Sequence, residues 1–314
     1  MSAPKNRPWL GPLVALVLVY LLFVLLSPDT FARPANLITM ARQTAVVGIA
    51  ASGMTLVIVL GGIDLSVGSA VALTTVVVAS LLKAGAAPWT AALAGVAVAA
   101  LTGTVNGALV AGLGITPFIV TLGSMSILRG AAKGLAHEQK IDVDTGGLDA
   151  LVLPPTHPFL VFSPSVWLML AVGAGTAVLL RRTRFGRHVV AIGSSPLTAR
   201  LAGIRVEAVT ILVYTLAAAL AGLAGVLEFG KLTVGDPTDS IGLELDVIAS
   251  VVIGGGSLSG GEGSVAGALL GALLMTVIKT GCTHVGLPNW VQQVVTGVII
   301  VTAVAIDRLR RRRR

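Results

Sequence analysis

Long apolar segments almost free of charged residues run through the chain and constrain its fold more than any other feature. Of its 314 residues, 55% are hydrophobic and 11% are charged, whereas a typical soluble domain is about 25% charged. A membrane-spanning helix needs about 20 mostly apolar residues. The sequence therefore predicts an all-α, polytopic membrane helix bundle of about ten transmembrane helices, of which the third, fifth and eighth are short. The predicted spans are residues 9–26, 37–60, 67–82, 89–112, 117–133, 164–180, 207–229, 244–256, 263–281 and 289–306.

The placement of basic residues predicts the orientation of this bundle. With an even number of spans, both termini share one side with the 181–206 loop, and together these segments hold 14 of the 22 lysines and arginines. The loops 134–163 and 230–243 on the other side carry mainly acidic residues. Because basic loops stay inside, we expect both termini in the cytoplasm and the chain in a bacterial cytoplasmic (inner) membrane. Basic clusters beside spans suit anionic lipid, so no nucleic-acid partner is expected.

The first apolar segment admits two interpretations. Lys5 and Arg7 before residues 9–26 resemble the start of a cleaved signal peptide. The following Ser27-Pro28-Asp29 offers no clear small-x-small cleavage site. A retained first span is therefore favoured, with cleavage as the alternative.

A glycine-rich break occurs twice between apolar helices. Residues 59–66 read VLGGIDLS and residues 252–259 read VIGGGSLS, each followed by a further apolar segment. Interrupted segments at matching places in two halves indicate a transport pathway, whereas chance similarity between Gly/Ala/Val-rich segments is the alternative. Both breaks face the cytoplasm if all ten segments cross, and the halves are inverted if the eighth is re-entrant. Gly103-x-x-x-Gly107 and Gly263-x-x-x-Gly267-x-x-x-Gly271 predict close helix packing.

No motif supports catalysis or nucleotide binding by this chain. Gly225–Lys231 approximates a phosphate loop, but Leu232 stands where the magnesium-binding hydroxyl residue belongs. Leu258–Glu262 resembles the signature of ABC ATPases, but no segment suits a soluble ATPase domain. One cysteine, Cys282, and four histidines make a disulfide framework or a metal cluster improbable. We expect a transport subunit that is not an enzyme, with no catalytic, cofactor-binding or metal residues.

Four stretches resemble the permeases of ribose, xylose, arabinose and galactose ABC importers, which are binding-protein-dependent monosaccharide importers. They occur in the family's order and are GGIDLSVGS (61–69), VNGALVAGLGITPFIVTLGSMSILRG (105–130), FGRHVVAIGSSPLTARLAGI (185–204) and ELDVIASVVIGGGSLSGGEGSVAGALLGALL (244–274). The chain departs from the family at Ser195, where members often have Asn, and at Thr116, where they often have a second Pro.

This resemblance implies a single transmembrane permease domain, residues 1–314, with a fold like that of the vitamin B12 permease. It consists of an N-terminal span and loop (1–36), the family core (37–306), which includes the cytoplasmic coupling loop (181–206), and a basic cytoplasmic tail (307–314). The implied function is import of a monosaccharide, ribose-like or related, by alternating access.

The implied partners are a cytoplasmic ABC ATPase that holds ATP and Mg, an extracytoplasmic sugar-binding protein, a second permease copy (identical or related) and the lipid bilayer. An ion-coupled secondary transporter of a small polar solute is the alternative from another class. Within the ABC class, a nucleoside or branched-chain amino acid is the alternative substrate. A membrane-embedded enzyme is least favoured, because no catalytic cluster is present.

The 181–206 loop is the candidate for ATPase coupling. We expect Pro196–Gly203 to form a short surface helix ended by glycine, and the resemblance assigns coupling to this segment. Anchoring of the arginines in lipid headgroups is the alternative. The candidate residues are Phe185, Gly186, Arg187, Ala199, Arg200 and Gly203.

Polar residues at membrane depth are candidates for the pathway or gate: Asp64, Ser66, Asn106, Thr121, Ser124 and Arg129. A carboxylate there is costly and marks a pathway or a partner, while capping of the next helix explains Asp64 or Ser66 equally well. Interhelical hydrogen bonding is favoured for Asn106, Thr121 and Ser124.

Three acidic residues and Arg129 are expected near the outer side. Arg129 either reaches outward or pairs with an acid such as Glu244. Glu244 and Asp246 are candidates for binding-protein docking, with interaction with the dipole at a helix N-terminus as the equal alternative. Glu228 is expected to face Lys231.

Overall fold

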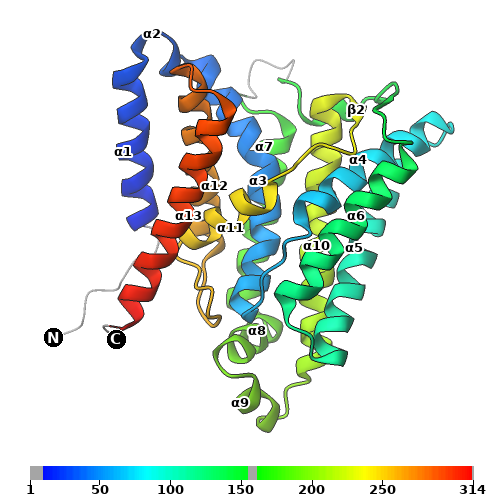
Figure 1. Cartoon of the computed structure of the whole chain (residues 1–314), viewed down its shortest axis with the longest axis vertical. Helices are drawn as coiled ribbons and strands as arrows, with labels where there is room; N and C mark the ends of the chain where they lie inside the picture. Colours follow the sequence, from blue (N-terminus) through cyan, green and yellow to red (C-terminus); the bar gives the residue numbers. More distant parts are fainter. Residues whose placement is uncertain (1–9, 155–160, 313–314) are drawn as a thin grey trace.

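A computed structural model describes residues 10–154 and 161–312, and within these ranges the chain is almost entirely helical (Figure 1). The only strands described are β1 (Ile141–Asp142) and β2 (Val234–Gly235), which pair antiparallel. The all-α prediction is therefore confirmed. The helices are α1 (Leu10–Leu26), α2 (Pro28–Phe31), α3 (Pro34–Leu60), α4 (Val67–Lys83), α5 (Pro88–Leu113), α6 (Pro117–Leu135), η1 (Leu148–Leu151), α7 (Pro164–Arg182), α8 (Arg184–Ser194), α9 (Pro196–Leu201), α10 (Val206–Leu232), α11 (Leu243–Ile253), α12 (Val265–His284) and α13 (Asn289–Arg312).

Proline and glycine set many of the helix ends. A proline occupies the first helical position of α3, α5, α6, α7 and α9, where it lacks an N–H that the helix would leave unpaired anyway. Gly61 ends α3 at φ +93° and Gly114 ends α5 at φ +65°, a left-handed conformation that glycine adopts without strain.

Helices occupy all ten predicted segments, but they differ in their ability to cross a membrane. Five are long and apolar enough: α3, α5, α7, α10 and α12. The helix at the expected eighth span, α11, has 11 residues, or about 16 Å at 1.5 Å per residue. The hydrocarbon core of a bilayer is about 30 Å thick, so α11 alone does not cross it.

The two glycine-rich breaks lie at the same end of the bundle (Figure 1). The α3 helix descends to the lower end, where the chain turns at Gly61 and runs back without helical structure to α4, which begins within the bundle. The α11 helix also begins within the bundle, and residues 254–264 lead from it to the lower start of α12. The α8–α9 loop and the end of α13 share this lower end, whereas α1 begins higher in the view.

Both predicted glycine faces make close helix contacts. A Cβ atom on Gly103 would overlap the Tyr214 carbonyl, and one on Gly107 would lie 2.7 Å from the Ile211 Cα, so α5 packs tightly on α10. A Cβ atom on Gly271 would overlap the Ser250 carbonyl of α11, and one on Gly267 would overlap the carbonyl of Gly254, which follows α11. The third glycine of that series, at residue 263, precedes α12 and packs beside a side chain of α3.

The first and last helices pack at one side of the bundle. Phe23 and Phe31 are buried against α12, and Phe23 fills the space that a side chain at Gly281 would need. The α13 helix continues through Arg312, so most of the expected tail 307–314 is helical, and its last two residues lie outside the described ranges. Lys5 and Arg7 also lie outside them.

Candidate functional site

A connected hydrogen-bond network links the first break to helices α5 and α6 in the interior. The Ser66 backbone N–H and hydroxyl donate to Asp64 Oδ1 at 2.8 and 2.6 Å. The Asn106 amide donates to Ser66 Oγ at 3.3 Å, and Ser124 Oγ donates to the Asn106 Oδ1. Thr121 Oγ1 donates to the Ile63 carbonyl at 3.1 Å. Five of the six candidate pathway residues therefore meet in one place.

This network holds a non-helical segment deep in the bundle. Backbone without helical hydrogen bonds is tolerated at membrane depth only where protein buries it or a cavity adjoins it. Asp64 Oδ1 accepts the N–H and the hydroxyl of Ser66, the residue before α4, and so closes the turn that leads into this helix. The first N–H groups of α4 itself receive no side-chain cap from Asp64 or Ser66, so the capping alternative is wrong. Asn106 of α5 and Ser124 of α6 make the interhelical bonds that the sequence favoured. The network thus fixes residues 61–66 against α5 and α6.

Tyr214 belongs to the same region and was missed by the sequence analysis. Its side chain is fully buried on α10, and a Cβ on Gly62 would overlap its hydroxyl. Among the described residues, this hydroxyl has no hydrogen-bond partner. A tyrosine within an apolar helix looks like an ordinary core aromatic residue, so only its hydroxyl could have marked it.

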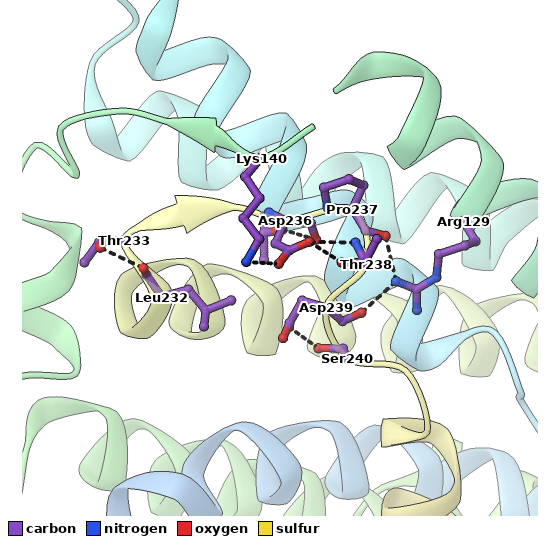
Figure 2. A network of polar contacts seen from close by, with 10 residues as sticks. Arg129, Lys140, Leu232, Thr233, Asp236, Pro237, Thr238, Asp239 and Ser240 are labelled. Carbon is purple, nitrogen blue, oxygen red and sulfur yellow. Dashed lines mark hydrogen bonds and ion pairs between the residues drawn. The ribbon is translucent and has the colours of Figure 1, made fainter. Parts of the chain in front are cut away.

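The sixth candidate, Arg129, lies apart from the network and anchors the loop before α11. Its guanidinium donates to the carbonyls of Pro237 and Asp239 at 2.9 and 2.6 Å, as Figure 2 shows. These carbonyls take the place of the expected carboxylate of Glu244. The α6 helix therefore holds residues 236–242 from one side.

The same loop is held from two further elements at its start. The Lys140 ammonium lies 3.0 Å from Asp236 Oδ2 (Figure 2), and the Asp236 backbone N–H donates to Thr75 Oγ1 at 3.3 Å. The pairing of β1 with β2 adds backbone hydrogen bonds beside these contacts. The loop is thus fixed to α4, α6 and the β1 segment.

The Asp236 carboxylate is stabilised in its charged form. Burial raises its pKa, but hydrogen bonds from the Thr238 hydroxyl and N–H and from Lys140 outweigh that effect, so the pKa lies below its ordinary value. The hydrogen bond to Asp236, with its charge, raises the pKa of Lys140.

The three acidic residues that the sequence analysis placed near the outer side, Glu228, Glu244 and Asp246, have partners within the chain. Asp246 is 4% exposed and forms an ion pair with Lys279 of α12. Glu244 Oε1 accepts the Gly242 N–H at 3.2 Å at the start of α11, which is the dipole interaction considered from sequence. The expected pairing of Glu228 with Lys231 is confirmed at 2.7 Å. The burial of Asp246 leaves little of it for a soluble partner to contact.

The expected coupling loop forms two short helices below the bundle (Figure 1). Ser195 Oγ accepts the Thr198 N–H at 3.2 Å as the cap of α9, a position where Asn serves equally well. This explains why Ser195 replaces the family's Asn without altering the helix. The α9 helix ends at Leu201, and Gly203 follows at φ +80°, so the predicted short helix is confirmed.

The remaining coupling candidates divide between buried and exposed positions. Phe185 packs against the main core and Ala199 is buried at the base of α9. Gly186 meets the Leu180 carbonyl so closely that a side chain would overlap it. Arg187 is exposed, and Arg200 forms an exposed pair with Glu207 at 2.5 Å.

Two leucines on α9 point away from the protein. Leu197 is 71% exposed and Leu201 is 82% exposed, and residues four apart lie on one face of a helix. The sequence analysis did not single them out, because the sequence of so short a helix does not show which of its faces is exposed. An exposed apolar pair on a loop outside the spans indicates a protein contact.

The backbone of α8 meets both glycine-rich breaks. A Cβ on Gly193 would overlap the Val59 carbonyl and would lie 2.6 Å from the Gly261 nitrogen. A Cβ on Gly260 would lie 2.5 Å from the Gly193 carbonyl and 2.9 Å from the Gly61 Cα. We call Gly61, Gly193, Gly260 and Gly261 the glycine junction. It joins the coupling loop to both breaks.

Comparison with known proteins identifies the family. A model for the branched-chain amino acid transport system / permease component family matches residues 36–304. The chain belongs to this permease family. The ribose import permease protein of Escherichia coli K12 is 38% identical over 309 residues, covering 96% of this chain and 95% of that protein.

Further curated members of the permease family are similar over nearly their whole length. The ribose import permease protein of Bacillus subtilis is 37% identical, covering 95% of this chain and 92% of that protein. The fructose import permease protein of Rhizobium meliloti is 35% identical, covering 96% and 86%. No solved structure matches the chain. Membership and the apolar helices establish a multi-pass transport component of the inner membrane.

Proposed function

We propose that this chain is the permease subunit of an ATP-driven importer that moves a monosaccharide, ribose or a related sugar, into the cytoplasm. The identity of 38% to a ribose import permease over nearly the whole chain carries this proposal. The family model is named for branched-chain amino acids, but the similar curated members named for a solute are ribose, fructose and L-arabinose permeases. Those names favour a sugar over an amino acid or nucleoside.

In this proposal residues 1–314 form one transmembrane domain of the vitamin B12 permease type, with both termini in the cytoplasm. Two copies of the permease together make the pathway. A soluble sugar-binding protein delivers the solute at the upper end, where residues 236–242 are held by Arg129 and Lys140. The network around Asp64 lies between the two ends, so it belongs to the part that opens alternately to each side.

The power for transport comes from a separate ATPase, which binds ATP and Mg. Leu197 and Leu201 provide its apolar contact, and the glycine junction passes its movement to the two breaks. Close backbone contacts suit this task because packed interfaces shift between discrete arrangements instead of deforming gradually. The chain itself performs no covalent chemistry. An ion-coupled mechanism gains no support, since Asp64 is engaged by Ser66 within the network.

The substrate is tested by deleting the gene for this chain in its own bacterium and measuring uptake of radiolabelled ribose at micromolar concentration. We expect loss of uptake, restoration by the intact gene, and competition by ribose above that by fructose, arabinose or xylose. Unchanged uptake of all four sugars, combined with lost uptake of a branched-chain amino acid or a nucleoside, would contradict the sugar assignment.

A further inference from the structure

A groove between α7 and α12 crosses the outer surface of α3 and is lined by apolar side chains. It has a volume of about 530 Å³ and is lined by Ala41, Thr44, Met169, Leu170, Ala266, Leu269, Leu270 and Leu273. Thr44 contributes the one polar side chain of this lining, and its hydroxyl already donates to the Met40 carbonyl at 2.7 Å. Such a groove offers nothing to a sugar or a soluble ion, whereas it suits a hydrocarbon chain.

A second cavity of about 620 Å³ lies at the cytoplasmic end of the same two helices. Arg181 of α7, Arg187 of α8 and Ser264, the cap of α12, contribute to its lining, together with Glu262. Two arginines and one glutamate give these side chains a formal charge of +1. The cavity therefore favours an anion.

The two cavities follow one another along both helices. On α12, the charged cavity includes Ser264 and the apolar groove begins at Ala266. On α7, Leu170 of the groove lies 11 residues before Arg181 of the cavity, or about 16 Å along the helix axis. The groove then extends along α12 from Ala266 to Leu273, about 10 Å of helix. A ligand with an anionic head and a hydrocarbon tail fits this order.

We propose that the α7–α12 groove binds one anionic phospholipid of the cytoplasmic leaflet, with its phosphate beside Arg181 and one acyl chain in the groove. Basic pockets between membrane helices on the cytoplasmic side bind such headgroups. The exposed leucines of α9 line neither cavity, so this site does not include the proposed apolar ATPase contact. Arg187, a coupling candidate, does line the charged cavity and is therefore left unaltered in the test. The lipid site also requires only the membrane location, and not the sugar assignment.

The test is native mass spectrometry of the full chain purified in detergent. The probes are phosphatidylglycerol and phosphatidylcholine with the same long acyl chains, dihexanoyl phosphatidylglycerol, and inorganic phosphate. We expect one long-chain phosphatidylglycerol to be retained more strongly than any other probe. Arg181→Gln should weaken its retention about fivefold, because one basic residue near an anionic lipid contributes about 1 kcal/mol. Arg182→Gln, an exposed neighbour outside the lining, is the matched control.

The groove is tested with Ala266→Phe, which fills it at an exposed position. This variant should lose long-chain phosphatidylglycerol while its weak binding of the dihexanoyl form stays unchanged. Should it fail to fold, the exposed Arg181→Gln variant still decides the question. Equal retention of phosphatidylcholine, equal loss in Arg182→Gln, or equal binding of inorganic phosphate would overturn the proposal. So would loss of ATPase binding by Arg181→Gln with lipid retention intact, since the cavity would then be a docking site.

Discussion

The backbone N–H of Gly261 donates a 2.8 Å hydrogen bond to the carbonyl of Val59. Val59 lies in the last turn of α3 and Gly261 in the break between α11 and α12, so this bond joins the two halves of the chain at the two glycine-rich breaks. Gly193, in the α8 part of the 181–206 loop, packs against both Val59 and Gly261. A displacement of α8 therefore acts on both breaks at once.

The glycine junction is tested by Gly260→Ala. Its left-handed φ of +81° costs an alanine about 1–3 kcal/mol, and the new Cβ would also lie 2.5 Å from the Gly193 carbonyl. Gly85→Ala is the matched control, with φ +87° and nothing near its Cβ position. We expect a larger fall in thermal midpoint for Gly260→Ala, together with loss of ATP-dependent uptake. Equal effects of the two substitutions would show that backbone strain alone matters and that the junction does not transmit movement.

The exposed leucines of α9 should be needed for ATPase binding and not for folding. Leu197→Ser with Leu201→Ser removes apolar surface that touches little of the permease. We expect an unchanged thermal midpoint but at least a tenfold fall in affinity for the ATPase, about 1.4 kcal/mol, measured by titration of the purified subunits. Leu153→Ser, at a 49% exposed leucine of the opposite loop, is the control. Binding as tight as that of the unaltered chain would disprove the contact.

Substitution of Asp64 separates a structural role from a pathway role. Asp64→Ala leaves the Ser66 N–H without its buried acceptor, which should cost about 1–3 kcal/mol. Asp64→Asn keeps an acceptor oxygen but removes the charge. We expect Asp64→Asn to retain most of the thermal stability. A difference in uptake rate between Asp64→Asn and the unaltered chain then measures the effect of the charge on transport. Uptake at the unaltered rate means that Asp64 acts only by holding the turn at Ser66, while a loss of more than tenfold with the fold intact assigns the charge to the pathway.

Acid should loosen the outer loop through Asp236. Folding lowers the pKa of Asp236 from its ordinary 3.8. The contribution of Asp236 to the stability of the loop is therefore complete above pH 3.8, and it is lost as the pH falls through the lower pKa of the folded state. Folding raises the pKa of Lys140, so the contribution of Lys140 to stability is complete below its ordinary pKa of 10.5 and is lost only at higher pH. Protease cleavage of the loop in the unaltered chain should therefore rise below about pH 4. Asp236→Asn should show raised cleavage already at pH 6 and little further change; a parallel rise in both proteins would contradict this.

Apolar length and the glycine-rich breaks predicted where the long helices lie, and the segment from Pro196 to Gly203 predicted the short helix. The sequence predicted a short eighth span and a break at 59–66, and the structure confirms both as α11 and the non-helical segment after Gly61. Whether the eighth span crosses or stops midway could not be predicted, because a short apolar segment has the same composition in both cases. Polarity alone identified Asp64, Asn106 and Ser124, since buried polar groups in lipid need partners. Tyr214 was missed because its contact with Gly62 depends on how α10 packs in the bundle, and no local sequence pattern predicts that packing.

The central claim is that the chain is a passive conduit driven by another subunit. The most direct measurement reconstitutes the purified permease in lipid vesicles with its ATPase, encloses ATP and Mg, adds the binding protein outside, and records labelled ribose uptake. The account predicts uptake only when permease, ATPase, binding protein and ATP are all present. Uptake by the permease alone under a proton or sodium gradient, or ATP hydrolysis by the permease alone, would contradict it.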